Sequence, residues 1–184
     1  MIFGATYEEL LINLRQYKKK YYLNRLVRGS LISIGLISSI FLVLALSEHF
    51  GRFNSFVRLA FLIFLLGSVA YTLSSWVLIP IIKLFQLDKA LSNEEAAKQI
   101  GSLFPEIKDK LVNTLQLQAQ PDTQTNALIL ASIQQKSNEL NTFEFAGGIK
   151  LSENRKYARF VLPPIFLIII LLFIIPGLLT ESAN

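Results

Sequence analysis

The side chains that could carry chemistry are few in this sequence. Cysteine is absent, which removes disulfides, thiolate nucleophiles and cysteine-based metal sites. The one histidine, His49, follows Glu48, and such a pair could share a proton or ligate a metal. One histidine and one carboxylate are nevertheless too few ligands for a closed metal site. The alternative is that both are turn residues beside Phe50 and Gly51, and we expect no bound metal.

The remaining polar residues also lack a catalytic pattern. The pair Gly147-Gly148 has neither the lysine nor the strand-to-helix setting of a phosphate-binding loop. No serine has a base and an orienting acid nearby in the sequence. Acidic residues between 88 and 110 are balanced by nearby lysines, as on solvated helix faces. The acidic residues are Asp88, Glu94, Glu95, Glu106 and Asp109, and the lysines are Lys89, Lys98, Lys108 and Lys110. The sequence therefore predicts a protein that is not an enzyme and takes no cofactor.

Apolar residues make up 52% of the chain and are concentrated in three long blocks, at 31–46, 59–82 and 160–179. No block contains Asp, Glu, Lys or Arg. Because roughly 20 apolar residues in a helix cross a hydrocarbon core of about 30 Å, each block can span a membrane. We predict an all-α integral membrane protein with three transmembrane helices and a helical cytoplasmic insert between the second and third. The absence of ionisable residues in the blocks argues against coupled ion transport by this chain alone.

The basic residues predict the orientation of these helices, because short loops rich in Lys and Arg stay in the cytoplasm. Arg52 is the one Lys or Arg of the loop 48–57, and Arg58 follows the loop. Glu181 is the one charge after the third block. The N-terminus and segment 83–158 are therefore predicted to be cytoplasmic, with loop 48–57 and the C-terminus outside. The other flanks hold the basic residues: Arg15, Lys18, Lys19, Lys20, Arg25, Arg28, Lys83, Lys89, Arg155, Lys156 and Arg159.

Two other interpretations of these features are less well supported. The pattern Ala45-Leu46-Ser47 could mark signal-peptide cleavage, but a structured leader of 28 residues favours an uncleaved signal-anchor. The net charge of +5 could indicate nucleic-acid binding, but the cations flank the apolar blocks, so no nucleic acid is expected. The predicted segments are a cytoplasmic interfacial helix at 1–28, a transmembrane hairpin at 29–82 (helices 29–47 and 58–82), a cytoplasmic helical domain at 83–158, a third transmembrane helix at 159–179, and the start of a periplasmic part at 180–184.

Residues 6–28 are predicted to form an amphipathic helix. Thr6 and Glu9 have capping-box spacing, and Tyr7, Leu10 and Leu14 lie on one apolar face. Tyrosines beside lysines suit the headgroup level of a membrane. The predicted membrane-surface residues are Tyr17, Lys18, Lys19, Lys20, Tyr21, Tyr22, Arg25 and Arg28. They either bind anionic lipid or a partner, or form an ordinary positive-inside flank.

Small residues recur at helical spacing in the first two apolar blocks and let backbones approach closely. They predict a tight antiparallel hairpin, unless their spacing is chance in a Leu/Ile background. Trp76 and Pro80 are expected near the cytoplasmic end of the second helix, and Pro163-Pro164 at the start of the third. The predicted helix-packing residues are Gly29, Ser33, Gly35, Ser39, Gly67, Ala70 and Ser74.

The insert is predicted to hold three helices. Ser92 and Glu95 form a capping box that opens the first, Pro105 restarts the second, and a turn at Pro121-Asp122 precedes a third at 124–140. The segment 143–149 is expected to pack back through its phenylalanines. A core of roughly 75 residues is marginal alone, so it should lean on the N-terminal helix or on a partner. The candidate partner-docking residues are Ile107, Leu111, Leu115, Leu128, Ile129 and Ile133.

Several stretches resemble a known family: KKKYYLNRLVRGSL, EHFGRF, FPEIKDKLVNTLQLQ, ASIQQKS and ENRKYARFVLPP. Together they are similar to the N-terminal region of a family of large, uncharacterised Bacteroidota inner-membrane proteins, in which three transmembrane helices precede a long periplasmic, partly coiled-coil body. The resemblance covers nearly the whole chain, and FPEIKDKLVNTLQLQ is its most specific part. It implies an anchor in the bacterial inner membrane for a cell-envelope assembly. Since the chain stops five residues after Leu179, we expect that the body is truncated.

These observations favour a non-enzymatic inner-membrane anchor or scaffold that docks partners through its insert. One alternative is an accessory subunit whose small-residue faces pack against a transporter or channel, and another is a transmembrane signal relay. The expected partners are a bilayer with anionic headgroups, other envelope membrane proteins and a soluble cytoplasmic protein. Homo-oligomerisation stays open.

Overall fold

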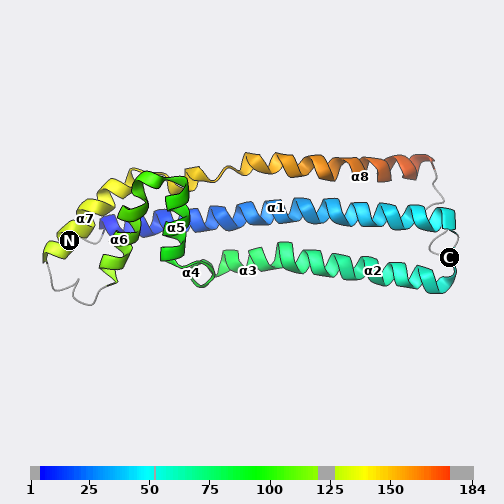
Figure 1. The fold of residues 1–184 in the computed structure, drawn as a ribbon, viewed down its shortest axis with the longest axis horizontal. Helices are drawn as coiled ribbons and strands as arrows, with labels where there is room; N and C mark the ends of the chain where they lie inside the picture. Colours follow the sequence, from blue (N-terminus) through cyan, green and yellow to red (C-terminus); the bar gives the residue numbers. More distant parts are fainter. Residues whose placement is uncertain (1–4, 52, 120–126, 175–184) are drawn as a thin grey trace. The chain divides into compact units, whose positions relative to one another are not determined.

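The computed structural model describes residues 5–51, 53–119 and 127–174, and it is helical with no strand in these ranges (Figure 1). The predicted all-α class is confirmed for this part of the chain. The chain divides into two compact units. Unit 1 comprises residues 1–24 and 82–150, and unit 2 comprises residues 25–81 and 151–184.

Three helical segments are long and apolar enough to cross a membrane, namely Thr6–Gly51, Ser55–Phe85 and Phe145–Ile174. The prediction of three such helices is confirmed. Helix α1 runs without a break over Ala5–Gly51, so the interfacial helix and the first transmembrane helix predicted as separate elements are one helix. Because α1 begins at Ala5, Thr6 lies within the helix and is not its N-cap as predicted.

Unit 2 contains the second half of α1 together with helices α2 (Ser55–Leu73) and α8 (Arg155–Ile174). Helix α2 begins at a cap in which the Asn54 side chain accepts a hydrogen bond from the Val57 amide at 3.1 Å. A short 3-10 helix, η5 (Leu151–Asn154), precedes α8. Within this unit α1 lies between α2 and α8 (Figure 1).

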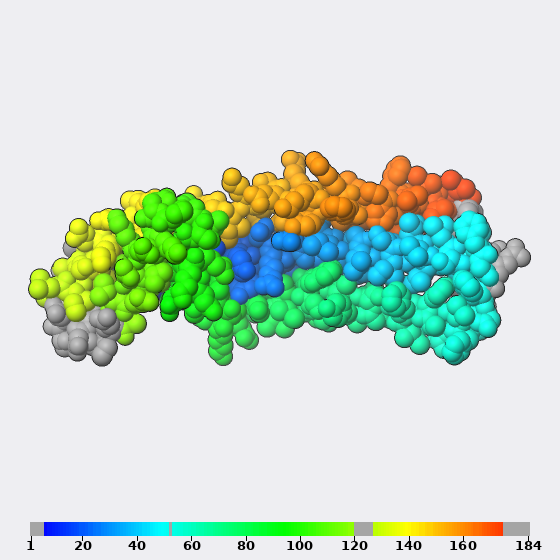
Figure 2. Space-filling view, in the orientation of Figure 1, coloured from blue at the N-terminus to red at the C-terminus, as the bar shows by residue number. Residues whose placement is uncertain are grey.

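The outer faces of α2 and α8 carry exposed apolar side chains, and Figure 2 shows the surface of these helices coloured along the sequence. Side chains such as Ile63, Leu66 and Phe173 are more than half exposed. Apolar surface of this extent is unfavourable in water and favourable in lipid. The unit therefore has the surface expected of a membrane-embedded bundle.

The prolines of unit 2 agree with the predictions in part. Pro80 lies five residues before the end of the segment Ser55–Phe85, as predicted, whereas Pro163 and Pro164 lie inside α8 and not at its start. The second segment passes from α2 through a π-helical turn, η1 (Ser74–Leu78), into α3 (Ile79–Phe85), and Pro80 is buried within it. Helix α8 begins at Arg155, so Pro163 and Pro164 fall in its interior. A π-helical turn next to a proline is one way for a helix to continue past the missing amide.

Unit 1 packs the first part of α1 against the insert. The insert contains α4 (Leu87–Ala90), α5 (Asn93–Leu103), η2 (Pro105–Ile107), α6 (Lys108–Gln118), α7 (Ala127–Asn141) and η4 (Phe145–Gly148). The capping box of Ser92 and Glu95 opens α5 as predicted, and Pro105 separates α5 from α6 as predicted. The predicted turn at Pro121-Asp122 and residues 175–184 lie outside the described residues.

The core of unit 1 is shared by both of its chain segments. Leu10 and Leu14 of α1 are fully buried with Ile100 of α5 and Leu111 of α6. Phe145 is 1% exposed, and Phe143 packs against the same core, so the segment 143–149 folds back as predicted. The expectation that the insert leans on the N-terminal helix is confirmed.

Candidate functional site

The predicted packing residues on α1 lie at contacts between helices of unit 2. A side chain at Gly29 would overlap the backbone carbonyl of Trp76 in η1. A Cβ at Gly35 would lie 3.4 Å from the carbonyl oxygen of Phe160 in α8. Ser33, between them, is 1% exposed. The structure thus brings Gly29, Ser33 and Gly35 into close helix contacts.

Both glycines face a backbone carbonyl that lacks its helical hydrogen-bond donor, because the residue four positions later is a proline. Trp76 is four residues before Pro80, and Phe160 is four residues before Pro164. Proline has no N–H, so neither carbonyl can receive the usual hydrogen bond from the residue four positions later. A glycine has no Cβ, so α1 can approach both carbonyls with its backbone. The bundle therefore contains two contacts of the same kind. In each, a glycine of α1 packs against a carbonyl that lies four residues before a proline in the neighbouring helix.

The two serines on α1 differ in their hydrogen bonding. The Ser39 hydroxyl donates to the Gly35 carbonyl oxygen at 2.8 Å, which is the usual arrangement for serine in an apolar helix. The buried Ser33 hydroxyl has no hydrogen-bond partner among the described residues. Ser39 therefore bonds within its own helix and does not bridge to another.

The predicted small-residue stripe on the second helix is exposed and is not at a contact with another described helix. A Cβ at Gly67 would meet nothing within 4 Å, and Ala70 and Ser74 are exposed. The buried residue of α2 is Thr72, whose hydroxyl donates to the Ser68 carbonyl at 2.8 Å. The contact face of the second segment thus includes Thr72 and Pro80, which lie about two helical turns apart. The prediction, which is based on small residues, includes neither of them.

Glu48 pairs with Arg58 and not with His49. The Arg58 Nε and Glu48 Oε1 atoms are 2.7 Å apart, although the N–H does not point along that line and no hydrogen bond forms. The ion pair joins the end of α1 to the start of α2. His49 contacts the Phe50 ring edge-on at 5.4 Å. Glu48 and His49 lie in the last turn of helix α1 and not in a connecting turn as predicted, and Arg52 lies outside the described residues.

Three of the predicted membrane-surface residues are buried inside unit 1. Tyr17, Lys18 and Tyr22 are 2%, 1% and 3% exposed. Their side chains cannot reach lipid headgroups in this fold, so the prediction is wrong for them. The reason is that the insert covers this face of α1, which the helical period alone presents as lipid-facing. Lys19, Arg25 and Arg28 are exposed, whereas Lys20 and Tyr21 are half-buried.

Lys18 is held by polar groups of the insert. Its Nζ donates to Asn93 Oδ1 at 2.8 Å and lies 3.5 Å from Asp88 Oδ1. Asp88 also accepts from Arg15 Nη2 at 3.3 Å. Nearby, the Tyr22 hydroxyl donates to the Ala90 carbonyl at 2.9 Å. Polar contacts therefore fix α1 against the α4–α5 segment in addition to the apolar core.

Four of the predicted docking residues are core residues. Ile107, Leu111 and Ile133 are at most 3% exposed, so they hold unit 1 together and are not available to a partner. The prediction is wrong for these three because an amphipathic stripe does not reveal whether its partner is in the same chain. Leu115 is 8% exposed and also lines a pocket. Ile129 is half-buried and Leu128 is 81% exposed.

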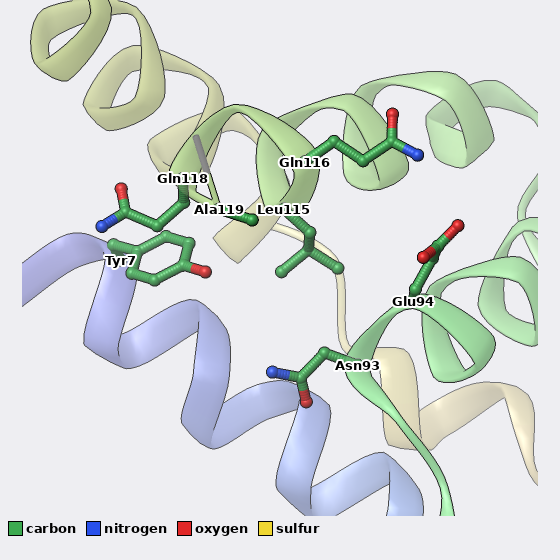
Figure 3. Close-up of a pocket in the computed structure, with 7 residues that line it drawn as sticks. All are labelled: Tyr7, Asn93, Glu94, Leu115, Gln116, Gln118 and Ala119. Carbon is green, nitrogen blue, oxygen red and sulfur yellow. The ribbon is translucent and has the colours of Figure 1, made fainter. Parts of the chain in front are cut away.

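A pocket of about 290 Å³ opens on unit 1 between α1, α5 and α6 (Figure 3). Tyr7 projects into it from α1, and Leu115 points into it from α6. Its lining is mostly amides and apolar groups, with one carboxylate: Tyr7, Asn93, Glu94, Leu115, Gln116, Gln118 and Ala119. The lining thus offers hydrogen-bonding amides beside an apolar side chain.

The environment of Glu95 in unit 1 favours the charged form of its carboxyl group. The Ser92 amide donates to Glu95 Oε2 at 3.0 Å, and this hydrogen bond lowers the pKa of the carboxyl from its ordinary value of 4.5. The Ser92 hydroxyl and the charge of Lys98 lower that pKa further. The shift belongs to the helix cap and not to a reactive site.

Within residues 5–51, 53–119 and 127–174, no three side chains of His, Cys, Asp or Glu gather in a way that could hold a metal ion. No protein-family model, no curated protein and no solved structure matches the chain.

Proposed function

We propose that this chain is a non-enzymatic membrane anchor that holds a helical docking domain at the cytoplasmic face of a bacterial inner membrane. The observation that carries the proposal is the shared core of unit 1. Residues before the first apolar helix and residues after the second are buried together, as with Leu14 and Leu111. Because these two segments share a core, they lie on the same side of any membrane, and the chain between them crosses it an even number of times. This supports the topology predicted from the basic residues.

Unit 1 would be the docking domain and unit 2 the anchor. The exposed apolar faces of α2 and α8 support insertion of unit 2. The pocket beside Tyr7 supports docking of a polar segment of another protein to unit 1. Other envelope membrane proteins and a soluble cytoplasmic protein remain the proposed partners.

The topology can be tested with introduced cysteines, because these 184 residues contain none. Ser55→Cys marks the start of α2, and Asn138→Cys marks the exposed side of α7. In spheroplasts, a membrane-impermeant thiol reagent should label Ser55→Cys and leave Asn138→Cys unlabelled until the cells are opened. Labelling of both positions in intact spheroplasts, or release of the chain from membranes by alkaline carbonate, would contradict the proposal.

Docking can be tested with a photo-crosslinking amino acid at Gln116, which lines the pocket, and at Lys98, on the exposed side of α5. A discrete adduct formed in cells from position 116 and absent from position 98 is expected. Equal adducts at both positions, or none, would remove the pocket from the proposal.

A second candidate function, an accessory subunit of a larger membrane protein, is favoured by the exposed small residues of α2. Gly67, Ala70 and Ser74 lie on one face without a neighbour in the chain at Gly67. Such a face lets another helix approach closely in lipid. Gly67→Leu should then abolish co-purification with a polytopic protein, and retention of that protein would exclude this role for the face.

A further inference from the structure

Five basic residues of unit 2 lie on α1 and at the start of α8. Two of them converge on a single aromatic ring. The Arg28 guanidinium carbon lies 4.8 Å from the centre of the Tyr157 ring, and the Lys156 ammonium lies 5.4 Å from the same centre. The five are Arg25, Arg28, Arg155, Lys156 and Arg159.

These two cations are not neutralised by the described part of unit 2. Its carboxylates are Glu48, which is paired with Arg58, and Glu153, for which no ion pair with Arg28 or Lys156 is present. Cation–π contacts position a guanidinium or an ammonium but leave its charge uncompensated. Two like charges on one ring repel each other, and an anion bound to both would relieve that repulsion.

The position of the ring along the helices indicates the kind of anion. On α1 the next residue is Gly29, which contacts Trp76, so Tyr157 and Trp76 flank neighbouring residues of α1. Tyrosine and tryptophan favour the membrane interface. The charge-free part of α1 begins at residue 29 and that of α8 at residue 160. An anion here would lie at headgroup level with hydrocarbon on one side.

Apolar side chains continue from the ring along the exposed face of α8. Phe160 is 74% exposed, and Leu167, two turns further along the same side of the helix, is 45% exposed. They offer a surface for acyl chains directly beside the cations. Free phosphate would use the cations alone, whereas a phospholipid would use both features.

We propose that Arg28 and Lys156, positioned by Tyr157, bind the phosphate of an anionic phospholipid whose acyl chains lie along Phe160 and Leu167. The inference rests on the proposed membrane function and adds a defined lipid site to it. Guanidinium donates paired hydrogen bonds to phosphate, and the ammonium adds a point charge. Zwitterionic lipid carries a compensating choline charge and should bind more weakly.

The test uses the full chain, purified in detergent, stripped of lipid and titrated with phosphatidylglycerol or phosphatidylcholine in native mass spectrometry. The readout is the preference for phosphatidylglycerol. Arg28→Gln and Lys156→Gln should each lower it about fivefold, since a cation near a membrane surface contributes about 1 kcal/mol. Tyr157→Leu should lower it without changing any charge, and Tyr157→Phe, which keeps the ring, should retain it.

The matched controls are Arg25→Gln and Arg159→Gln, which remove the same charge from the same helices away from the ring. If these variants lower the preference for phosphatidylglycerol as much as Arg28→Gln does, and Tyr157→Leu has no effect, the lipid is attracted by the summed positive charge. That result would refute a defined site at the ring. Inorganic phosphate that displaces phosphatidylglycerol at equal concentration would also refute a lipid site. A chain that stays in bilayers without lipid preference refutes this inference alone, whereas a chain not retained in bilayers refutes the membrane function.

Discussion

Lys18 illustrates how a single residue fixes α1 within unit 1. Its ammonium is buried at 1% exposure, and its closest acceptor is Asn93 Oδ1. We expect Asn93→Ala to destabilise unit 1 by about 1–3 kcal/mol, because a buried charged donor then loses its acceptor. Hydrogen exchange of α5 and α6 amides in the purified chain would measure the loss.

Lys18→Met supplies the control for this prediction. It removes the charge together with its need for an acceptor and should be close to neutral in stability. In that background Asn93→Ala should cost little more. An equal loss from Asn93→Ala with and without Lys18 would show that the hydrogen bond is not the cause.

The cap of α5 predicts a pH dependence. The folded-state pKa of Glu95 lies below its ordinary value of 4.5, so the contribution of its charge to stability is fully present above pH 4.5 and is lost as the pH falls through the folded pKa. Protection of the α5 amides should therefore decrease in this acid range. Glu95→Gln, which can still accept from the Ser92 amide, should show less of this decrease, and an unchanged profile would contradict the assignment.

At the scale of the element, the glycines of α1 and α2 make opposite predictions. Gly29→Ala should destabilise unit 2 by roughly 1–3 kcal/mol, because the new methyl group overlaps the Trp76 carbonyl and the backbones must separate. Gly67→Ala should be neutral or stabilising by up to about 1 kcal/mol, because nothing lies within 4 Å and alanine favours helix. Thermal unfolding in detergent, followed by the loss of helical signal, measures both. Equal effects would show that the Gly29–Trp76 contact does not carry stability.

Elements of this chain could be predicted from sequence more fully than their contacts. The apolar blocks and the Ser92–Glu95 cap depend on composition and local spacing, and both were predicted. The burial of Tyr17 depends on an insert about 80 residues away, as its hydroxyl contact with Gln99 shows. The face of α1 that meets η1 and α8 depends on prolines in other helices. No local pattern contains that information, so Gly67 and Gly29 look alike in sequence.

At the scale of the whole molecule, unit 1 should require both of its chain segments. The insert 82–150 alone lacks Leu10, Leu14, Tyr17 and Tyr22, which belong to its core. We expect it to remain helical but to give broad, poorly dispersed amide resonances. Joining residues 5–24 to it through a flexible linker should give sharp, dispersed resonances and a cooperative unfolding transition. Dispersed resonances from the insert alone would show that the N-terminal helix is dispensable for the core.

The same composite core sets an order of events during synthesis. Asn13 bonds to Asn141, 128 residues later in the chain, at 3.3 Å. At roughly 5–20 residues per second, the ribosome needs about 6–25 seconds to make the residues between them. In a chain that inserts as proposed, the first two membrane helices are already in place during that interval, while Leu10 and Leu14 still lack their partners. The N-terminal part of α1 is therefore without its core partners until α7 has been synthesised. During that time the membrane surface or a chaperone can cover its apolar face.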